Sequence, residues 1–159
     1  MAVATPKPAG GLKVIAKNRR ALHDFAIEDH LEAGIALKGS EVKSCRAGRV
    51  SLQDAYVQVV NGDALLFNCH IAEYEQANRL NHEPTRTRRL LLHRREIDRL
   101  DVRLRQQGQT AVVLSAYFKQ GRVKLDLGIG KGKTYTDRRD SVREREAKRE
   151  VARAMRRRR

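Results

Sequence analysis

The part of the sequence that comes nearest to a catalytic motif is the glycine- and lysine-rich run at residues 128–134 (GIGKGKT). A nucleotide-hydrolase phosphate loop requires a glycine five positions before its Gly-Lys-Thr, and here that position is Leu127. Such a loop also needs a helix with an apolar face directly after it, which residues 135–140 (YTDRRD) do not supply. The run is therefore predicted to be a flexible connection between a folded body and a tail.

The cysteines and histidines do not combine into a metal site or a nucleophile. Cys69, His70 and His82 lack a fourth ligand and the usual zinc spacing. Cys45 and Cys69 are isolated thiols without CxxC spacing. No Ser/His/Asp or Cys/His set can be assembled either. We therefore predict a protein that is not an enzyme and uses no metal and no cofactor.

The charge of the chain points to a polyanionic partner. Lys and Arg number 34 against 19 Asp and Glu, a net charge of +15. The stretch from Lys131 to Arg159 holds thirteen basic and five acidic residues, a net +8, which leaves +7 for the rest. Both parts suit nucleic acid or an anionic membrane. No apolar run approaches the ~20 residues of a membrane span, and no signal peptide follows Met1, so nucleic acid in the cytoplasm is favoured.

The basic tail has too few apolar residues to fold by burial. A segment of this composition cannot offset roughly 1–2 kcal/mol per residue of backbone ordering, so we expect it to be disordered when free. It still carries helix signals, because Ser141 and Glu144 have the capping-box spacing and Glu144 precedes Lys148 by four residues. The tail is predicted to become a helix against a polyanion; a solvated tail with only non-specific charge is the alternative.

The apolar pattern predicts a body built mainly from strands. Apolar residues alternate with polar ones in several segments, and Asn61-Gly62 between two apolar runs is a strong hairpin signal. The first predicted strand is long and bends at Gly34. The predicted strands are residues 12–37, 56–60, 64–67, 110–119 and 122–129.

Two helices are predicted in the body. The longer helix lies within residues 90–107. His93 and Glu96 resemble an N-cap and its N3 partner, and Gly108 is the expected stop. Leu90 and Leu91, at the start of this range, are compatible with an extended backbone before the helix begins. A shorter helix at residues 39–47 has Ser40 as its cap. Residues 70–89 are polar and are predicted to be irregular.

The fold class that follows is mainly β, a β-barrel with α. Consecutive hairpins favour antiparallel pairing, and a small closed barrel would hide the strand edges. Three regions are expected: a flexible leader at residues 1–11, a barrel at residues 12–130 and the basic tail at residues 131–159. A monomer is expected.

Basic residues recur along the body and favour RNA or DNA as the partner. Because only seven residues are aromatic, base stacking is not expected to dominate, and recognition of structured RNA by shape and phosphate fits better. A structural ribosomal protein or general RNA chaperone is the alternative. The basic residues are Arg19, Arg20, Lys38, Lys43, Arg46, Arg49, Arg86, Arg88 and Arg89.

Several blocks in combination resemble one family. They are residues 15–20 (IAKNRR), 23–25 (HDF), 31–35 (LEAGI), 39–44 (GSEVKS), 81–93 (NHEPTRTRRLLLH), 131–133 (KGK) and 137–139 (DRR). Over residues 12–149 the chain resembles the SsrA-binding protein family (small protein B, SmpB).

The resemblance implies an OB-like closed antiparallel barrel with one longer and one or two short helices. It implies transfer-messenger RNA as partner, bound through its tRNA-like domain and delivered to stalled bacterial ribosomes. There the tail would fold as a helix in the empty mRNA channel, near ribosomal RNA of the decoding centre, so that trans-translation frees the ribosome.

The resemblance also implies site residues. The residues that match RNA-binding positions of the family are Asn18, His23, Glu32 and Leu91; the neighbouring basic residues expected to join them are Arg19, Arg20, Lys38 and Lys43. The residues expected to meet the ribosome are Lys131, Gly132, Lys133, Tyr135, Asp137, Arg138, Arg139, Arg143 and Arg145.

Four expectations that follow from the resemblance are specific enough to test. Glu32 is expected to accept hydrogen bonds from base amino groups or a 2′-hydroxyl, against the alternative of a solvated carboxylate; Leu91 is expected either to contact RNA or only to pack. Arg138 stands where the family usually has Lys, and Thr134 and Thr136 where Lys and an aromatic are common, so stacking there would fall to Tyr135. Deletion of everything after Ile129 is expected to spare RNA binding and abolish rescue.

Overall fold

The structure is a computed structural model that describes residues 12–157, apart from the side chains of residues 78–80 and 135. The predicted leader at residues 1–11 lies outside the described residues. The elements, in chain order, are β1 (Lys13–Lys17), α1 (Arg19–Asp24), β2 (Phe25–Ile35), α2 (Gly39–Arg46), β3 (Val50–Ser51), β4 (Tyr56–Val60), β5 (Asp63–Phe67), β6 (His70–Ile71), the 3-10 helix η1 (Glu75–Leu80), β7 (Arg88–Leu91), α3 (Arg94–Gln106), β8 (Thr110–Lys119), β9 (Arg122–Gly132) and α4 (Tyr135–Arg157).

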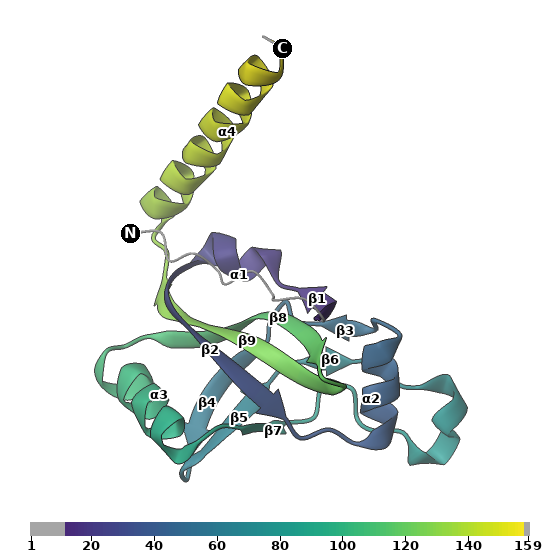
Figure 1. Ribbon diagram of the computed structural model, residues 1–159. Helices are drawn as coiled ribbons and strands as arrows, with labels where there is room; N and C mark the ends of the chain where they lie inside the picture. Colours follow the sequence, from purple (N-terminus) through teal and green to yellow (C-terminus); the bar gives the residue numbers. More distant parts are fainter. Residues whose placement is uncertain (1–11, 158–159) are drawn as a thin grey trace.

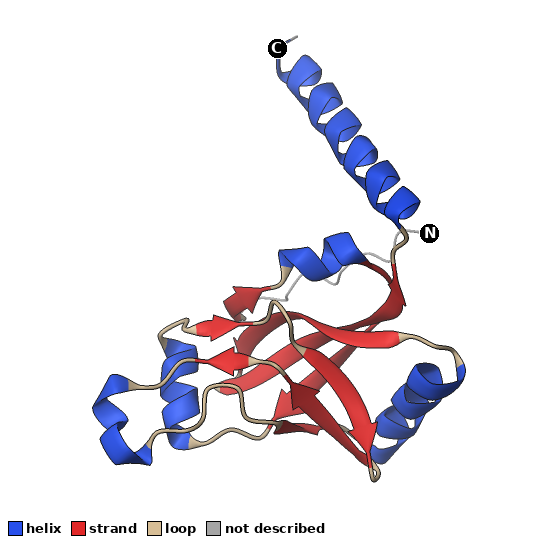
Figure 2. Cartoon of the chain, turned by 180° about the vertical axis from the view of Figure 1, so that it is seen from behind, coloured by secondary structure: helices blue, strands red, loops and turns tan. Residues whose placement is uncertain are grey.

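One large antiparallel sheet organises the body. Its hydrogen-bonded order is β1-β8-β4-β5-β7-β2-β9, and β9 pairs again with β8. The short strands β3 and β6 form a second, two-stranded sheet. Figures 1 and 2 show α2 and α3 on opposite sides of this sheet, and α1 at the end of the body from which α4 leaves. The prediction of a mainly β fold with a few helices is confirmed.

The core lies inside the curved sheet and is aliphatic. Leu66, Val113 and Leu127, from three different strands, have no exposed surface. Each such side chain contributes about 1.5–3 kcal/mol relative to leaving it in water. α3 adds Ile97 and Leu100 from one side. The outward residues of the same strands remain available for a partner.

The first predicted strand is wrong, because α1 interrupts it between β1 and β2. Asn18 caps this helix: its Oδ1 accepts from the backbone N of Ala21 at 3.1 Å, and its Nδ2 donates to the carbonyls of Leu52 and Val113 at 2.8 and 3.0 Å. These carbonyls come from distant segments, so alternation within residues 12–37 did not reveal the helix. Gly34 lies inside β2, where an added Cβ would sit 3.1 Å from the Cβ of Leu91.

The remaining predicted elements of the body are largely confirmed. The hairpin around Asn61-Gly62 joins β4 to β5, with positive φ at both turn residues. α3 begins after His93, whose backbone N donates to Glu96 at 2.9 Å, and positive φ at Gly108 follows its end. The cap predicted for α2 is wrong: Lys38 occupies the N-cap, and Ser40 instead bonds a buried histidine.

Residues 70–89 are more ordered than predicted, because a buried ion cluster holds them. Arg88 and Glu41 have no exposed side-chain surface and lie 3.2 Å apart, and Arg86 donates to the same carboxylate. Arg88 also donates to the carbonyls of Cys69 and Pro84 at 2.7 and 3.0 Å. The cluster joins α2 to β7 and to the connection between β6 and β7. Charged residues at these positions had suggested solvent exposure.

The prediction of a flexible Gly/Lys connection is also wrong, because β9 continues to Gly132. Gly130 and Gly132 pair with Ile27 and Phe25 of β2. A Cβ added at Gly130 would lie 1.9 Å from the carbonyl oxygen of Ala26. Gly130 therefore allows β9 and β2 to approach closely, and the run up to Gly132 is part of the sheet rather than a flexible connection. A segment used in this way is not a phosphate loop.

The tail is the helix α4, which projects from the body beyond α1 (Figure 1). Thr134 and Asp137 cap its start: the backbone N of Thr134 donates to Asp137 Oδ2 at 3.1 Å, and Thr134 Oγ1 accepts from the backbone N of Asp137 at 3.3 Å. The helix is confirmed, but it starts before the predicted Ser141 cap. Several of its side-chain contacts are local, such as Ser141 Oγ donating to the carbonyl of Asp137 and Lys148 Nζ donating to Glu144. Within residues 12–157, no helix combines the length and apolarity that a membrane span requires.

Candidate RNA-binding interface

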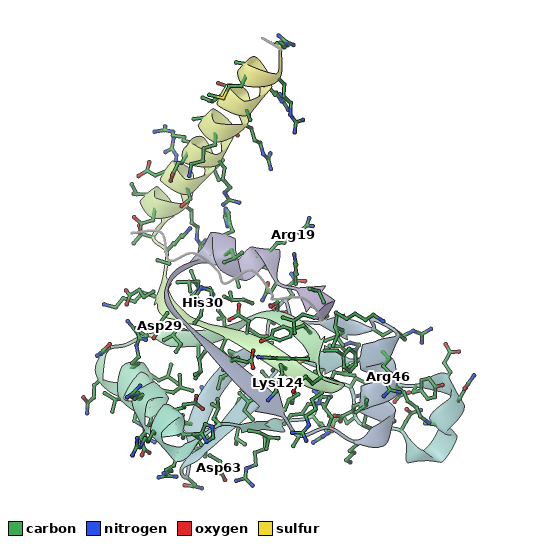
Figure 3. The ribbon with its side chains drawn as sticks, viewed as in Figure 1. Arg19, Asp29, His30, Arg46, Asp63 and Lys124 are labelled. Atoms are coloured by element: carbon green, nitrogen blue, oxygen red, sulfur yellow. The ribbon has the colours of Figure 1, made fainter. Side chains whose placement is uncertain are left out.

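α1 displays basic side chains at one end of the sheet. Arg19 and Arg20 are exposed and His23 is half-buried. Figure 3 shows Arg19 projecting from α1 on the side away from the sheet. Asn18 does not join this surface: it is 5% exposed, and its amide is fully used in the internal bonds described above. Asn18 therefore acts on the three basic residues by starting the helix that carries them.

The base of the tail lies against the other end of α1. The backbone N of Lys133 donates to the carbonyl of Asp24 at 2.8 Å. Lys133 Nζ donates to the carbonyl of Leu22 at 3.3 Å and to Ser141 Oγ at 3.0 Å. Arg138 Nε lies 4.0 Å from the carboxylate of Asp24. The structure thus brings two predicted tail residues, Lys133 and Arg138, next to the predicted RNA-binding helix of the body.

Glu32 lies on the outward face of β2 and is 42% exposed. The hydroxyl of Tyr117 donates to it, and Lys119 Nζ lies 3.1 Å from its Oε1. The hydrogen bond from Tyr117 lowers the pKa of Glu32, and the nearby Lys119 and Lys124 lower it further. Glu32 is therefore ionised at neutral pH and has a fixed orientation. It is a supported acceptor rather than a freely solvated carboxylate.

The outward-facing side chains around Glu32 form a polar and cationic patch. The sequence did not predict that Tyr117, Lys119 and Lys124 belong to it. Lys124 lies on β9 (Figure 3) and pairs in the sheet with both Gly34 and Tyr117, two residue pairs along β2 from Glu32. Within residues 122–129, Arg122, Lys124 and Asp126 alternate with apolar residues, and this pattern predicts that Lys124 lies on the outward face. Its neighbours depended on the register of β2, β8 and β9, which the sequence did not reveal.

Leu91 is a surface residue, since 56% of it is exposed. It lines a pocket of about 260 Å³ together with Leu37, Val42 and Lys124. An exposed leucine beside lysines can pack against a base or ribose. The structure therefore leaves Leu91 available for contact with RNA, in the same patch as Glu32.

α2 borders the same pocket through Val42 and carries the last predicted basic residues of the body. Lys38 and Lys43 are both exposed. Lys43 Nζ lies 5.3 Å from the ring centre of Tyr74, a cation–π contact that fixes its position. The predicted residues of the body thus fall into two groups: one on α1, and one formed by Glu32, Leu91 and α2.

The remaining tail residues have different roles. Lys131 and Gly132 are the last residues of β9. Asp137 is a capping residue, and its hydrogen bonds with Thr134 lower its pKa. Thr134, which departs from the family pattern, is its capping partner. The exposed arginines along the first half of α4 are Arg138, Arg139, Arg143 and Arg145.

A larger pocket, of about 560 Å³, lies between β2 and α3 and contains none of the predicted residues. A β-bulge at residues 27–29 turns Glu28 and Asp29 toward Arg103, whose nitrogens lie 3.8 and 2.6 Å from the two carboxylates. His30 Nδ1 lies 3.2 Å from Asp126. These charges are mutually paired, which distinguishes this pocket from the basic surface.

Thiol and metal chemistry have no support in the described part of the chain. Burial raises the pKa of Cys45 to about 12 and that of Cys69 to about 11, so both are protonated and inaccessible at neutral pH. Across residues 12–157, no group of three or more His, Cys, Asp or Glu side chains could hold a metal ion.

The fold and the surface together define a class: a small, basic, mainly β protein with an exposed polar and cationic patch and a cationic helical extension. Within that class, a sequence profile of the SmpB protein family matches residues 15–157, and the chain belongs to this family.

Similar proteins agree with this assignment. SsrA-binding protein of Symbiobacterium thermophilum is 56% identical over 91% of this chain and 92% of its own. SsrA-binding protein of Thermobifida fusca is 54% identical over 94% of this chain and 93% of its own. A chain of a solved structure described as "tmRNA-SmpB: a journey to the center of the bacterial ribosome" superposes with a TM-score of 0.65 at 42% identity, over 80% of this chain and 94% of that one. The family resemblance of the sequence is confirmed.

Proposed function

We propose that this protein binds transfer-messenger RNA (tmRNA) and acts with it on stalled bacterial ribosomes in trans-translation. The observation that carries the proposal is the match to a tmRNA-SmpB structure over nearly the whole of that chain, at 42% identity. SsrA-binding relatives that are more than half identical over most of the chain support it. The chain's own surface is consistent, because two basic regions meet at α1.

In this proposal the body and the tail have separate tasks. The body binds the tRNA-like domain of tmRNA, and the tail enters the mRNA channel that is empty in a stalled ribosome. α4 has 23 residues and no apolar face that needs the body; at 1.5 Å per residue it extends for about 35 Å. We place the boundary after Lys133 rather than at residue 130, because β9 and its contact with Asp24 belong to the body.

We interpret the body as an OB-like closed barrel. The pairing from β8 through β4, β5, β7, β2 and β9 returns to β8. Closure of this kind leaves few free strand edges and gives a rigid surface on which outward residues keep their positions. It supports recognition of folded RNA by shape, because the patch around Glu32 is built from three strands of the barrel.

We propose direct RNA contact for the exposed predicted residues and an indirect role for Asn18. Phosphates are expected to meet the basic side chains, whereas Glu32, held by Tyr117 and Lys119, accepts from a base amino group or a 2′-hydroxyl. Leu91 supplies apolar contact beside it. The proposed contacts of the body are Arg19, Arg20, His23, Glu32, Lys38, Lys43 and Leu91.

For the free protein we propose that α4 exchanges between helix and coil. A helix without tertiary burial is marginal in water, and its net charge repels itself. Ribosomal RNA neutralises that charge and favours the helix. The protein works as a monomer in the cytoplasm, where ribosomes are, and contributes binding rather than catalysis.

Binding and tagging assays with a shortened chain test the proposal. The chain ending at Lys133 keeps all of β9, whereas the cut after Ile129 suggested by sequence alone would remove three strand pairs with β2. The shortened chain should bind tmRNA at 0.2 M salt within a few-fold of full length, yet fail to tag a nascent chain on a message without a stop codon. An unrelated structured RNA of equal length is the control.

Two results would contradict the proposal. Equal affinity for tmRNA and the control RNA would favour a general ribosomal or chaperone protein. Tagging by the chain that ends at Lys133 would contradict the separate task of the tail. Affinity should also fall steeply with salt, as expected when about 6–10 phosphates are contacted.

A further inference from the structure

Asp24 is an acidic residue at the centre of the basic junction between α1 and α4. It is the last residue of α1 and the only acid in that helix (RRALHD). Its side chain is 24% exposed and has three basic neighbours: His23 Nδ1 at 3.0 Å, Arg20 Nε at 3.3 Å and Arg138 Nε at 4.0 Å. A carboxylate here weakens attraction for phosphate, so its value to an RNA-binding surface must come from what it does to its neighbours.

The first neighbour is His23. The hydrogen bond with His23 lowers the pKa of Asp24, and the charges of Arg138 and Arg20 lower it further, so this carboxylate is ionised at neutral pH. An ionised carboxylate only accepts hydrogen bonds, so Nδ1 of His23 must carry the proton in this contact. Nε2 of the neutral ring is then an acceptor. RNA offers matching donors in its base amino groups and 2′-hydroxyls.

The second neighbour is the base of the tail. The carbonyl of Asp24 accepts from the backbone N of Lys133, and its carboxylate attracts Arg138 in the first turn of α4. In Figures 1 and 2, α4 leaves the body directly beside the end of α1. One residue therefore contacts both the RNA-binding helix and the segment that sets the direction of the tail.

We propose that Asp24 is a positioning residue that sets the proton position of His23 and the direction of α4, and so couples RNA contact by the body to placement of the tail. The inference rests on the proposed function, in which His23 contacts RNA and the tail enters the channel. Asp24 itself need not touch RNA.

Two substitutions separate the two contacts, and a third is a matched control. Asp24→Ala removes both contacts, whereas Asp24→Asn keeps an oxygen that can accept from His23 but loses the charge that attracts Arg138. Asp98→Ala is the control, because Asp98 also pairs with an arginine four residues away, Arg94, and its loss changes the net charge equally.

The first measurement is the tautomer of His23 in the free full-length chain, read from its ring ¹⁵N shifts by NMR. The wild-type, Asp24→Asn and Asp98→Ala proteins should show Nδ1–H. Asp24→Ala should shift to Nε2–H, the form that an unpartnered imidazole prefers. An unchanged tautomer in Asp24→Ala would overturn the first half of the proposal, and this readout requires neither RNA nor a ribosome.

The second measurement is tmRNA affinity and tagging. Asp24→Ala should bind roughly three- to tenfold more weakly even though it adds positive charge, the size expected from losing one hydrogen bond between neutral groups. Asp98→Ala should bind equally or more tightly. Asp24→Asn should bind nearly as wild type but tag less, and Arg138→Ala should add little further loss to it.

The outcomes separate the two proposals. If Asp24→Ala binds and tags as Asp98→Ala does, Asp24 is not a positioning residue. If His23→Ala binds tmRNA as tightly as wild type, the proposed RNA contact of His23 fails, whereas the tautomer result still decides what Asp24 does to the ring. Thermal unfolding of Asp24→Asn, which keeps the side-chain shape, shows whether any loss reflects unfolding.

Discussion

The body and the tail carry nearly equal positive charge, +7 and +8, but are ordered by different forces. In the body, contacts between residues far apart in the chain bury leucines and even a charged pair, Glu41 with Arg88. In α4, beyond its base near Asp24, the printed contacts lie within about one helical turn, such as Glu144 with Lys148 at 2.8 Å. Similar net charge therefore accompanies two kinds of order, one based on burial and the other mainly on contacts within a helix.

This difference suits a protein whose two parts meet RNA in different ways. In the proposed function, a rigid body presents acceptors such as Glu32, held by Tyr117 and Lys119, in fixed positions that distinguish one folded RNA from another. A helix held only by local contacts can adapt to a narrow channel and gains order from its surroundings. The predictions below test this contrast, beginning with the largest expected effect.

Removal of the buried carboxylate should be the most damaging single change. Glu41→Ala leaves Arg88 buried without its partner, and breaking such a pair costs about 3–5 kcal/mol. The free energy of unfolding from urea titration should fall by this amount. Glu144→Ala, which breaks an exposed pair in α4, should leave the main unfolding transition unchanged; an equal loss in both would contradict the contrast.

A cavity in the core should rank next. Leu127 has no exposed surface, and Leu127→Ala should lower the free energy of unfolding by about 2–5 kcal/mol. Val151 in α4 is smaller and 55% exposed, so Val151→Ala should change the free energy of unfolding by less than about 0.5 kcal/mol. Calorimetry of both variants provides the measurement. A lowered transition in the Val151 variant would show that α4 packs on the body.

Acid should weaken the body through the same buried cluster. Burial alone would raise the pKa of Glu41, but hydrogen bonding by Arg86 and the charges of Arg88 and Arg86 lower it overall from 4.5. Since the folded-state pKa is depressed, the stabilisation is complete above the unfolded pKa and is lost as pH falls through the folded value. The stability difference between wild type and Glu41→Gln should therefore shrink below about pH 4.5. A difference that grows with acid would contradict the assignment.

Loss of the tail cap should have the smallest effect, and one confined to α4. Thr134→Ala removes the side chain that accepts from the backbone N of Asp137, and loss of a helix cap costs about 1 kcal/mol. The helical signal in circular dichroism should fall while the unfolding temperature of the body stays constant. Thr136→Ala is the control, because Thr136 is an exposed threonine in the first turn of α4. Equal signals from both variants would show that Thr134 does not cap α4.

Local signals in the sequence were reliable where the backbone itself decides the structure. Asn61-Gly62 made the predicted turn, because both residues adopt positive φ. His93 and Glu96 formed the predicted cap of α3, because the bonded groups are three residues apart. The alternation of residues 122–129 placed Lys124 on the outward face, where it joins the candidate site.

Glycine and asparagine were harder to interpret from the sequence, because each residue type has more than one structural use. The glycines of residues 128–132 indicated flexibility, but they lie in β9, where Gly130 allows a close approach to the backbone of β2. Asn18 matched an RNA-binding position, but its amide bonds carbonyls 34 and 95 residues away. Which use applies depends on the distant segment that lies opposite.

The sequence by itself determined the family, through several blocks that resemble it, and the mainly β class and the charge of the tail, which follow from periodicity and composition. Only the tertiary structure decided that Arg88 and Glu41 are buried together, that Tyr117 supports Glu32, and that Asp24 joins α1 to the tail. Each of these is a contact between distant residues, and strand register and burial, which create such contacts, are properties of the folded chain as a whole.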